Sequence, residues 1–194
     1  MTLLLLPFLL RVEAAVVLDN DYVRVTRDAA PCAQAATPGC GHRIVVALGD
    51  LTLVSGAAPR RMARGDIAVF EPGESYEPPA GAFYEVAIKP GHPPVLRPPE
   101  VIAAEKNTLL YDAAEFFVFE EKLDPGDTRA RHSHSQRVVI QLNRTRLQQW
   151  PDGEPEKFVD IVPERPTFSP PVIHVVKNVG AAPLRGVVIE FKPR

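Results

Sequence analysis

One strand pattern occurs twice in this chain. Residues 43–53 (RIVVALGDLTL) match residues 137–147 (RVVIQLNRTRL) position by position. Both copies are rich in β-branched residues, which favour strands. A repeat of this kind implies two units of related shape that pack together. Two later pairs of segments also match: residues 70–76 with 168–174, and residues 85–90 with 188–193.

The composition favours an all-β fold. The 194 residues include 21 prolines, and helical periodicity is scarce, so a turn-rich arrangement of strands is expected. The repeat predicts an N-terminal unit at residues 16–90 and a C-terminal unit at residues 111–194. Residues 91–110 are expected to join them as a proline-rich linker followed by one short helix over residues 100–110, because Pro98 and Pro99 suit a helix start.

Three of the five histidines fall in two strands of the second copy. His132 and His134 stand two residues apart, so on a strand their side chains share one face. His174 lies on a later β-branched segment. Three imidazoles bind one divalent transition metal (Fe, Mn, Ni, Cu or Zn) and leave coordination positions open. We therefore predict a metal site on these three residues.

The spacing of these residues resembles the two sequence motifs of the cupin superfamily. Residues 126–134 match the first motif, in which five residues separate a glycine from a His-x-His pair. Residues 170–178 resemble the second, with Pro170, His174 and Asn178 in its order. Cupins are small β-barrels that often bind one metal. The resemblance implies two cupin-type double-stranded β-helix (jelly-roll) barrels in tandem, a bicupin.

The resemblance is incomplete at one metal ligand. Cupins often add a glutamate to the three histidines, but this glutamate would fall at Val138 or Val139. Val172 also stands where the family prefers a glycine. The resemblance therefore implies a site of three neutral imidazoles without a carboxylate.

The strand alternation extends the histidine face beyond His134, to Gln136, Val138 and Ile140. Gln136 is therefore a candidate for a weak fourth ligand. Each bound imidazole also needs a hydrogen-bond acceptor that sets its tautomer. The candidates for this role are Gln136, Asn178 and Gln141. Three glutamates on neighbouring strands are interpreted as surface charges: Glu120, Glu121 and Glu190.

The first copy lacks every predicted ligand. In the alignment of the two copies, the positions of His132, His134 and His174 are taken by Pro38, Cys40 and Tyr76. The N-terminal barrel is therefore expected to bind no metal and to have a structural role, packing against its twin or a second subunit.

Two classes of function remain open. One is a mononuclear metal enzyme, dioxygenase-like or isomerase-like, that acts on a small organic molecule. The other is a non-catalytic module that binds a small ligand or has a structural role only. A wide pocket beside the imidazoles favours the enzyme, and a mouth plugged by Trp150 or by phenylalanines favours the module. The net charge of −2 and the lack of basic runs argue against nucleic acid or a membrane as a partner; a homodimer is compatible with the sequence.

The N-terminus and the cysteines bear on the cellular compartment. Residues 1–15 contain a short apolar run that is either a secretory signal or an N-terminal strand. Cys32 and Cys40, the only two cysteines, lie in one loop-like segment and are expected to form a disulfide in an oxidising compartment. The predicted location is periplasmic or secreted, with the cytoplasm as the alternative.

Overall fold

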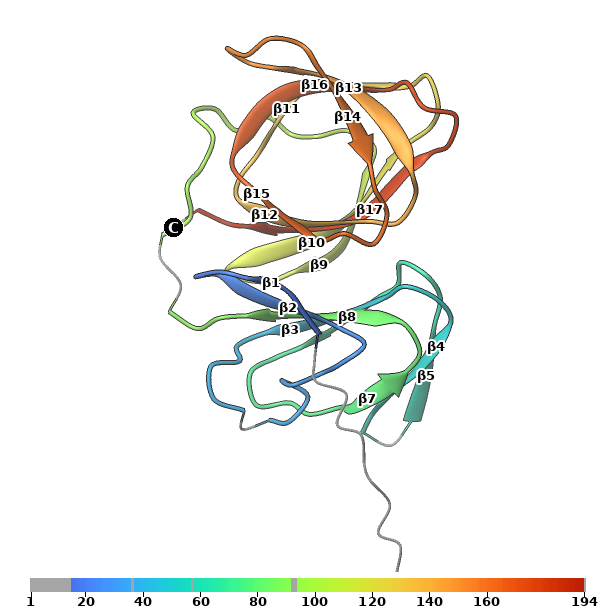
Figure 1. The fold of residues 1–194 in the computed structure, drawn as a ribbon. Helices are drawn as coiled ribbons and strands as arrows, with labels where there is room; N and C mark the ends of the chain where they lie inside the picture. The colour runs from blue at the N-terminus through green and yellow to red at the C-terminus, as the bar shows by residue number, and fades with distance from the viewer. Residues whose placement is uncertain (1–14, 36, 57, 92–93, 194) are drawn as a thin grey trace, which may run out of the picture.

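The computed structural model describes residues 15–35, 37–56, 58–91 and 94–193. These residues form 17 β-strands and no helix, and they build two barrel-like halves, one above the other in Figure 1. Accordingly, no helix in this part of the chain is long and apolar enough to cross a membrane. The predicted signal peptide lies outside the described residues, apart from Ala15, which begins the first strand.

The N-terminal half contains eight strands in two antiparallel sheets. One sheet has the order β1-β2-β8-β3-β6, and the other has the order β5-β4-β7. The strands are β1 (Ala15–Asp19), β2 (Val23–Arg27), β3 (Arg43–Ala47), β4 (Leu51–Ser55), β5 (Ala58–Met62), β6 (Ile67–Phe70), β7 (Glu77–Ala80) and β8 (Phe83–Ile88).

The C-terminal half contains nine strands in a matching arrangement. Its sheets have the orders β9-β10-β17-β12-β15 and β11-β16-β13-β14. The strands are β9 (Asn107–Asp112), β10 (Phe116–Leu123), β11 (Thr128–His134), β12 (Arg137–Gln141), β13 (Thr145–Pro151), β14 (Lys157–Ile161), β15 (Thr167–Ser169), β16 (Val172–Asn178) and β17 (Leu184–Phe191).

The sheet orders confirm the internal repeat. The N-terminal sheet β1-β2-β8-β3-β6 corresponds strand by strand to the C-terminal sheet β9-β10-β17-β12-β15. The alignment of the two sequence copies also pairs β3 with β12. The two halves are therefore built on one strand plan.

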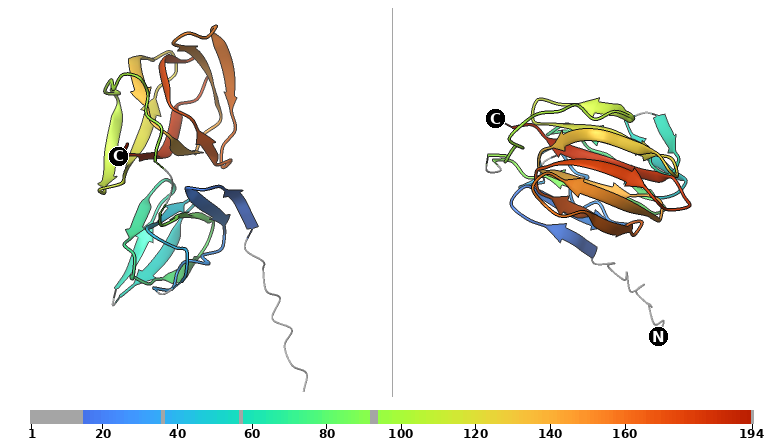
Figure 2. Two further views of the ribbon diagram at one scale, coloured as in Figure 1. Left: turned by 90° about the vertical axis from the view of Figure 1, so that its left-hand side faces the viewer. Right: turned by 90° about the horizontal axis from the view of Figure 1, so that it is seen from above.

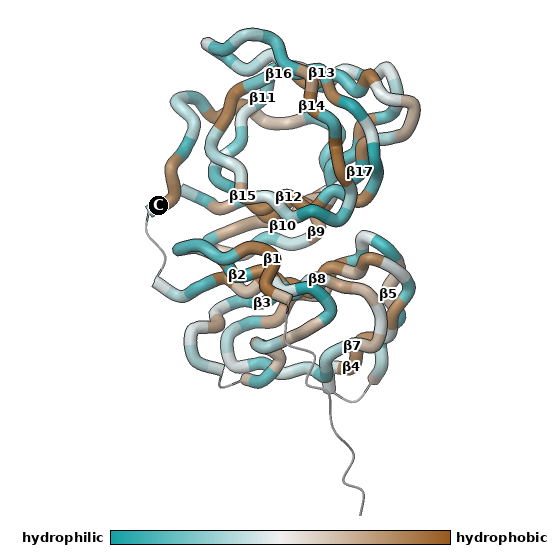
Figure 3. Tube along the Cα trace, viewed as in Figure 1, coloured by the Kyte–Doolittle hydropathy of each residue, from teal (hydrophilic) through white to brown (hydrophobic). Residues whose placement is uncertain are grey.

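The two five-stranded sheets pack face to face and share one hydrophobic core. Ile44 and Val46 of β3 are fully buried there, as are Val138 and Ile140 of β12, which occupy the equivalent repeat positions. Figure 2 shows the two sheets meeting between the halves, and Figure 3 shows hydrophobic residues along the strands on both sides of this junction. Burial of this shared face joins the halves into one molecule.

The interior of the N-terminal half is filled with side chains. Val45 and Ala47, on the opposite face of β3, belong to a second apolar cluster with Met62, Phe70 and Phe83. The only two cysteines form the predicted Cys32–Cys40 disulfide, with a Cα–Cα distance of 5.9 Å. The disulfide therefore closes the loop between β2 and β3.

Residues 94–110, the described part of the linker before and into β9, contain no helix, so the predicted helix over residues 100–110 is wrong. Residues 107–112 form β9, which pairs with β10 at the edge of the sheet, and Lys106 has a positive φ of 61° that ends any helical run. The Ala-Ala-Glu-Lys stretch before it is too short to hold a helix by itself. The C-terminal half therefore begins at Asn107, earlier than the predicted position 111.

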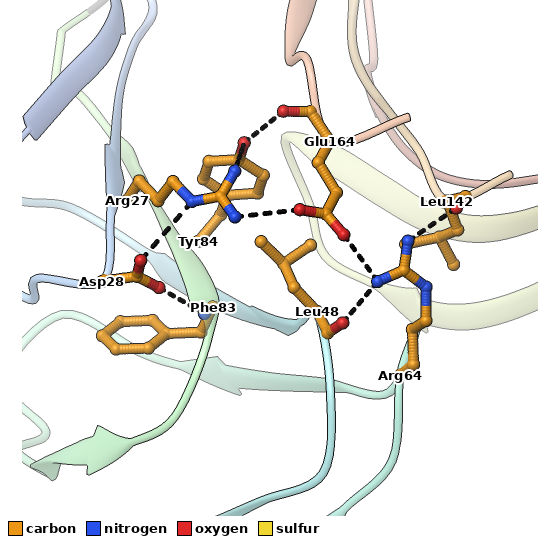
Figure 4. A network of polar contacts seen from close by, with 8 residues as sticks. All are labelled: Arg27, Asp28, Leu48, Arg64, Phe83, Tyr84, Leu142 and Glu164. Atoms are coloured by element: carbon orange, nitrogen blue, oxygen red, sulfur yellow. Dashed lines mark hydrogen bonds and ion pairs between the residues drawn. The ribbon is translucent and has the colours of Figure 1, made fainter. Parts of the chain in front are cut away.

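Polar contacts also tie the two halves together at the edge of the shared core. Glu164, in the loop after β14, forms ion pairs with Arg27 (2.9 Å) and Arg64 (2.7 Å) of the N-terminal half. Tyr84 donates a hydrogen bond of 2.5 Å to the Glu164 carbonyl oxygen. Arg64 also donates to the Leu142 carbonyl oxygen at 2.6 Å, as Figure 4 shows. We refer to Arg27, Arg64, Tyr84 and Glu164 as the inter-half clamp.

Candidate metal centre

Two neighbouring strands bring the three histidines together. β11 and β16 run antiparallel, with His132 directly opposite His174. His134 lies two residues along β11 and therefore points to the same face. The turn before β11 contains Gly126, whose positive φ of 83° suits glycine. All three histidines are buried.

The imidazole nitrogens converge on one point. Nε2 of His174 lies 3.1 Å from Nε2 of His132, and one ligand nitrogen from each of the three rings lies within 4.8 Å of the others. Nitrogens bound to one metal at about 2.1 Å lie roughly 3–3.5 Å apart. Two facing lone pairs at 3.1 Å repel unless a proton or a cation lies between them. The donor set therefore fits a transition metal.

In His132 and His134, the ring nitrogen Nδ1 forms a hydrogen bond, which leaves the lone pair of Nε2 free for a metal. Nδ1–H of His132 donates to the Ala130 carbonyl oxygen at 2.8 Å, and Nδ1–H of His134 donates to the Glu190 carboxylate at 2.7 Å. Acceptors of this kind fix the tautomer of metal-binding histidines. His174 Nδ1 is buried and has no hydrogen-bond partner among the described residues.

Burial keeps the three imidazoles neutral. It lowers the pKa of His134 and of His174 to about 2, and it also lowers the pKa of His132. A neutral imidazole offers a lone pair to a metal, whereas an imidazolium does not. Burial raises the pKa of Glu190 to about 7. The contact between His134 and Glu190 is therefore a hydrogen bond from a neutral imidazole, not an ion pair.

Two cavities adjoin the cluster. The larger, of about 530 Å³, lies inside the C-terminal half and is lined by His134 and His174 together with residues of β12, β14 and β15. A second cavity of about 360 Å³ is lined mainly by apolar residues, with His134 and Glu190 in its wall. Trp150 lines neither cavity and donates a hydrogen bond to Glu156 at 2.9 Å. The larger cavity has the volume of a small-molecule site.

A bend between β11 and β12 overturns the predicted histidine face. β11 ends at His134 and β12 begins at Arg137, so the alternation restarts after the bend. Arg137, Val139 and Gln141 line the larger cavity. Val138 and Ile140, predicted for the histidine face, are instead buried in the core shared by the two halves.

The predicted supporting residues lie in three different places. The Gln136 amide oxygen, predicted as a weak fourth ligand, accepts a hydrogen bond from the Leu96 N–H of the linker at 2.9 Å. The Asn178 side chain donates to the Leu123 carbonyl oxygen at 2.9 Å and accepts from Thr145, so it braces the far end of β16.

Gln141 is the one predicted supporting residue that reaches the cavity wall. It lines the larger cavity, and its amide lies 3.4 Å from the Glu121 carboxylate. None of the three supporting candidates contacts an imidazole through any hydrogen bond found among the described residues.

Two glutamates interpreted as surface charges belong to the site. Glu190 is buried, and in addition to its bond with His134 it accepts a hydrogen bond from the Ser135 N–H at 2.7 Å. Glu121 lines the larger cavity and pairs with Arg129 at 2.6 Å. Burial raises the pKa of Glu121, but the charge and the hydrogen bond of Arg129, together with the charges of other neighbours, outweigh burial, and the pKa is lowered. One signal was present in the sequence: Glu190 is the single charge in the apolar run VVIEF.

The chain resembles cupins in structure. No family model and no curated protein matches its sequence. It is similar to a cupin 2 conserved barrel domain protein from Leptotrichia buccalis (TM-score 0.52, 13% identity, 92% of this chain and 88% of that one). It is also similar to AerE from Microcystis aeruginosa (TM-score 0.52, 17% identity, 89% and 88%), and to salicylate 1,2-dioxygenase from Pseudoaminobacter salicylatoxidans (TM-score 0.51, 10% identity, 88% and 68%). The protein is therefore an all-β protein with the cupin fold.

Proposed function

We propose that the C-terminal half is a mononuclear metal enzyme that acts on a small organic molecule. The observation that supports it most strongly is the convergence of three neutral imidazoles beside a cavity of about 530 Å³, with His134 and His174 in its wall. Cavities of 300–1,000 Å³ are typical of small-ligand sites. A mouth plugged by aromatic side chains would favour a non-catalytic module, and Trp150 and the phenylalanines are absent from the described lining of this cavity.

In this proposal, some residues of the site bind the metal and others orient the residues that bind it. His132, His134 and His174 would hold the metal through Nε2. The Ala130 carbonyl oxygen and Glu190 orient two of the rings. The metal, when bound, supplies Lewis acidity toward a substrate oxygen or, if it is redox-active, electrons for dioxygen chemistry. These two chemistries correspond to isomerase-like and dioxygenase-like reactions, and the fold shared with a salicylate 1,2-dioxygenase makes the second one worth testing.

Metal analysis of the purified protein tests the binding part of this proposal. We expect about one transition metal per chain in the wild type, by elemental mass spectrometry, and its loss in His132→Ala and His174→Ala variants. His42→Ala is a matched control, because His42 pairs with Glu71 at 2.6 Å and lies outside the cluster. Equal trace metal in the wild type and all the variants would refute the metal site.

An activity assay distinguishes the proposed metal enzyme from the alternative, a non-catalytic binding module. The metal-loaded protein is incubated with small organic acids and sugars, with and without dioxygen. Oxygen consumption that is lost in His174→Ala assigns a dioxygenase-like reaction, and oxygen-independent product assigns an isomerase-like one. Ligand binding without product in either condition assigns the non-catalytic alternative.

A further inference from the structure

The larger cavity is lined by equal numbers of acidic and basic side chains, but not all of them are paired. Its lining includes three carboxylates, and each one already has a basic partner. These pairs are Glu121 with Arg129 at 2.6 Å, Glu154 with Lys157 at 2.9 Å, and Asp160 with Arg146 at 3.7 Å. The three carboxylates of the lining are therefore neutralised by basic residues of the protein.

Two cations of the same lining have no such partner. Arg137 and Arg165 line the cavity, and neither forms an ion pair with any described residue. Arg165 is exposed at the rim, whereas Arg137 sits on β12 inside the barrel. Nη1 of Arg137 donates to the carbonyl oxygens of Ser135 (3.2 Å) and Pro170 (2.9 Å). Among the described residues, its Nε and Nη2 have no hydrogen-bond partner.

An unpaired guanidinium inside a barrel is costly. Arg137 is half-buried, and burial lowers its pKa. A guanidinium nevertheless stays charged in proteins, so a negatively charged ligand would stabilise it. The carboxylates of Glu121 and Glu190 act on it only from a distance. Arg137 lies near the imidazole cluster, because it lines the same cavity as His134 and His174.

We propose that the ligand of this cavity is a small organic carboxylate, held by Nε and Nη2 of Arg137 while another oxygen of the same molecule faces the three histidines. The two free donors form a planar fork that matches a carboxylate. Val139, Leu147 and Val188 line the same cavity and suit an organic body. The position of the second oxygen rests on the proposed metal function, whereas the role of Arg137 does not.

Paired ligands test this assignment. Salicylate, pyruvate and succinate are each compared with the corresponding neutral amide by thermal shift and titration calorimetry, on metal-loaded and metal-free protein. We expect at least one acid, and not its amide, to bind the wild type. In Arg137→Gln its dissociation constant should rise about 10- to 100-fold, as for loss of charge-assisted hydrogen bonds. The control Arg24→Gln removes an arginine of the N-terminal half that pairs with Asp19, so this variant should bind as the wild type does.

The outcomes separate this inference from the proposed function. Arg137→Lys keeps the charge and should retain part of the binding, and a cooperative thermal transition shows that each variant is folded. Binding of no acid, equal binding of acids and amides, equal binding of inorganic phosphate, or unchanged binding in a folded Arg137→Gln overturns the carboxylate assignment. If the wild type holds no metal but binds acids through Arg137, the proposed function fails and this inference stands.

Discussion

At the scale of single residues, the buried Glu190 links the histidine cluster to the sheet behind it. One carboxylate oxygen accepts from His134 Nδ1–H and the other from the Ser135 N–H, both at 2.7 Å. These bonds hold the imidazole with Nε2 toward its two neighbours. Glu190 would therefore act on a bound metal through His134.

We expect Glu190→Gln to weaken metal binding about 10- to 100-fold, the effect typical of losing a carboxylate partner of a metal-binding histidine. Competition with a chromogenic chelator measures the affinity. Glu120→Gln is the control, because Glu120 pairs with Arg185 away from the cluster. Equal affinity in the wild type and Glu190→Gln would show that Glu190 has no part in orienting His134.

The sequence predicted the three histidines but not their surroundings. Spacing of two residues on a strand and a family motif were enough to group His132, His134 and His174, which the structure brings together. Arg137 was missed because the alternation was continued through the bend at residues 135–136, and Glu190 was missed because it was interpreted as a surface charge. No residue type marks that bend, since it depends on how β12 pairs with β17.

The second buried glutamate, Glu85, predicts a pH dependence of stability. Burial raises its pKa above the model-peptide value of 4.5, although hydrogen bonds from Tyr76 and the Cys32 N–H partly offset this. The folded state therefore binds this proton more tightly than the unfolded state does. Its stabilising contribution is fully present below pH 4.5 and is lost as the pH rises through the raised value.

Urea denaturation of the wild type and of Glu85→Gln, repeated across this pH range, measures that contribution. We expect the difference in unfolding free energy between the two proteins to shift in favour of the variant as the pH rises, because glutamine has no proton to lose. A difference that does not change with pH would contradict the assignment to Glu85.

At the scale of elements, the two halves differ most at the segment that carries two of the predicted ligands. In the C-terminal half this segment is β11, whereas the N-terminal half has the loop closed by Cys32–Cys40. Pro38 and Cys40 stand there in place of His132 and His134. The repeat predicted this loss of ligands, but not that the strand itself would be replaced by a loop.

We expect replacement of both cysteines by serine to lower the free energy of unfolding by roughly 2–3 kcal/mol, the chain-entropy value for so short a loop. Chemical denaturation with and without a reducing agent measures it, and reduction should affect the wild type only. Metal content should not change, because the loop belongs to the other half. A loss of metal on reduction would show that the halves are coupled through this loop.

The disulfide fits the predicted periplasmic or secreted location, because disulfides form and persist in oxidising compartments. Thiol titration of protein isolated without reducing agents, from its natural host, tests this. Two reactive thiols per unfolded chain would favour the cytoplasmic alternative.

At the scale of the whole molecule, the inter-half clamp connects the N-terminal half to the rim of the larger cavity. Glu164 is followed directly by Arg165, which lines that cavity. The ion pair between Arg64 and Glu164 spans 2.7 Å, with side chains 35% and 28% exposed. The N-terminal half, which has none of the predicted ligands, thus helps to position the loop beside the site.

A double-mutant cycle with Arg64→Ala and Glu164→Ala measures this connection. We expect a coupling energy of about 1 kcal/mol in unfolding free energy, because the pair is only partly shielded from solvent. Additive effects of the two substitutions would mean that the pair contributes nothing to joining the halves.

The shared core has a practical consequence for anyone who wishes to redesign this site. An isolated C-terminal barrel would present the bare outer faces of β10, β12 and β17 to water, with residues such as Val118, Ile140 and Ile189 uncovered. A surface of this kind promotes aggregation. Mutant libraries of this site should therefore vary the lining of the larger cavity in the chain that contains both halves. Removal of the N-terminal half would also remove the sheet that covers this apolar face and prevents aggregation.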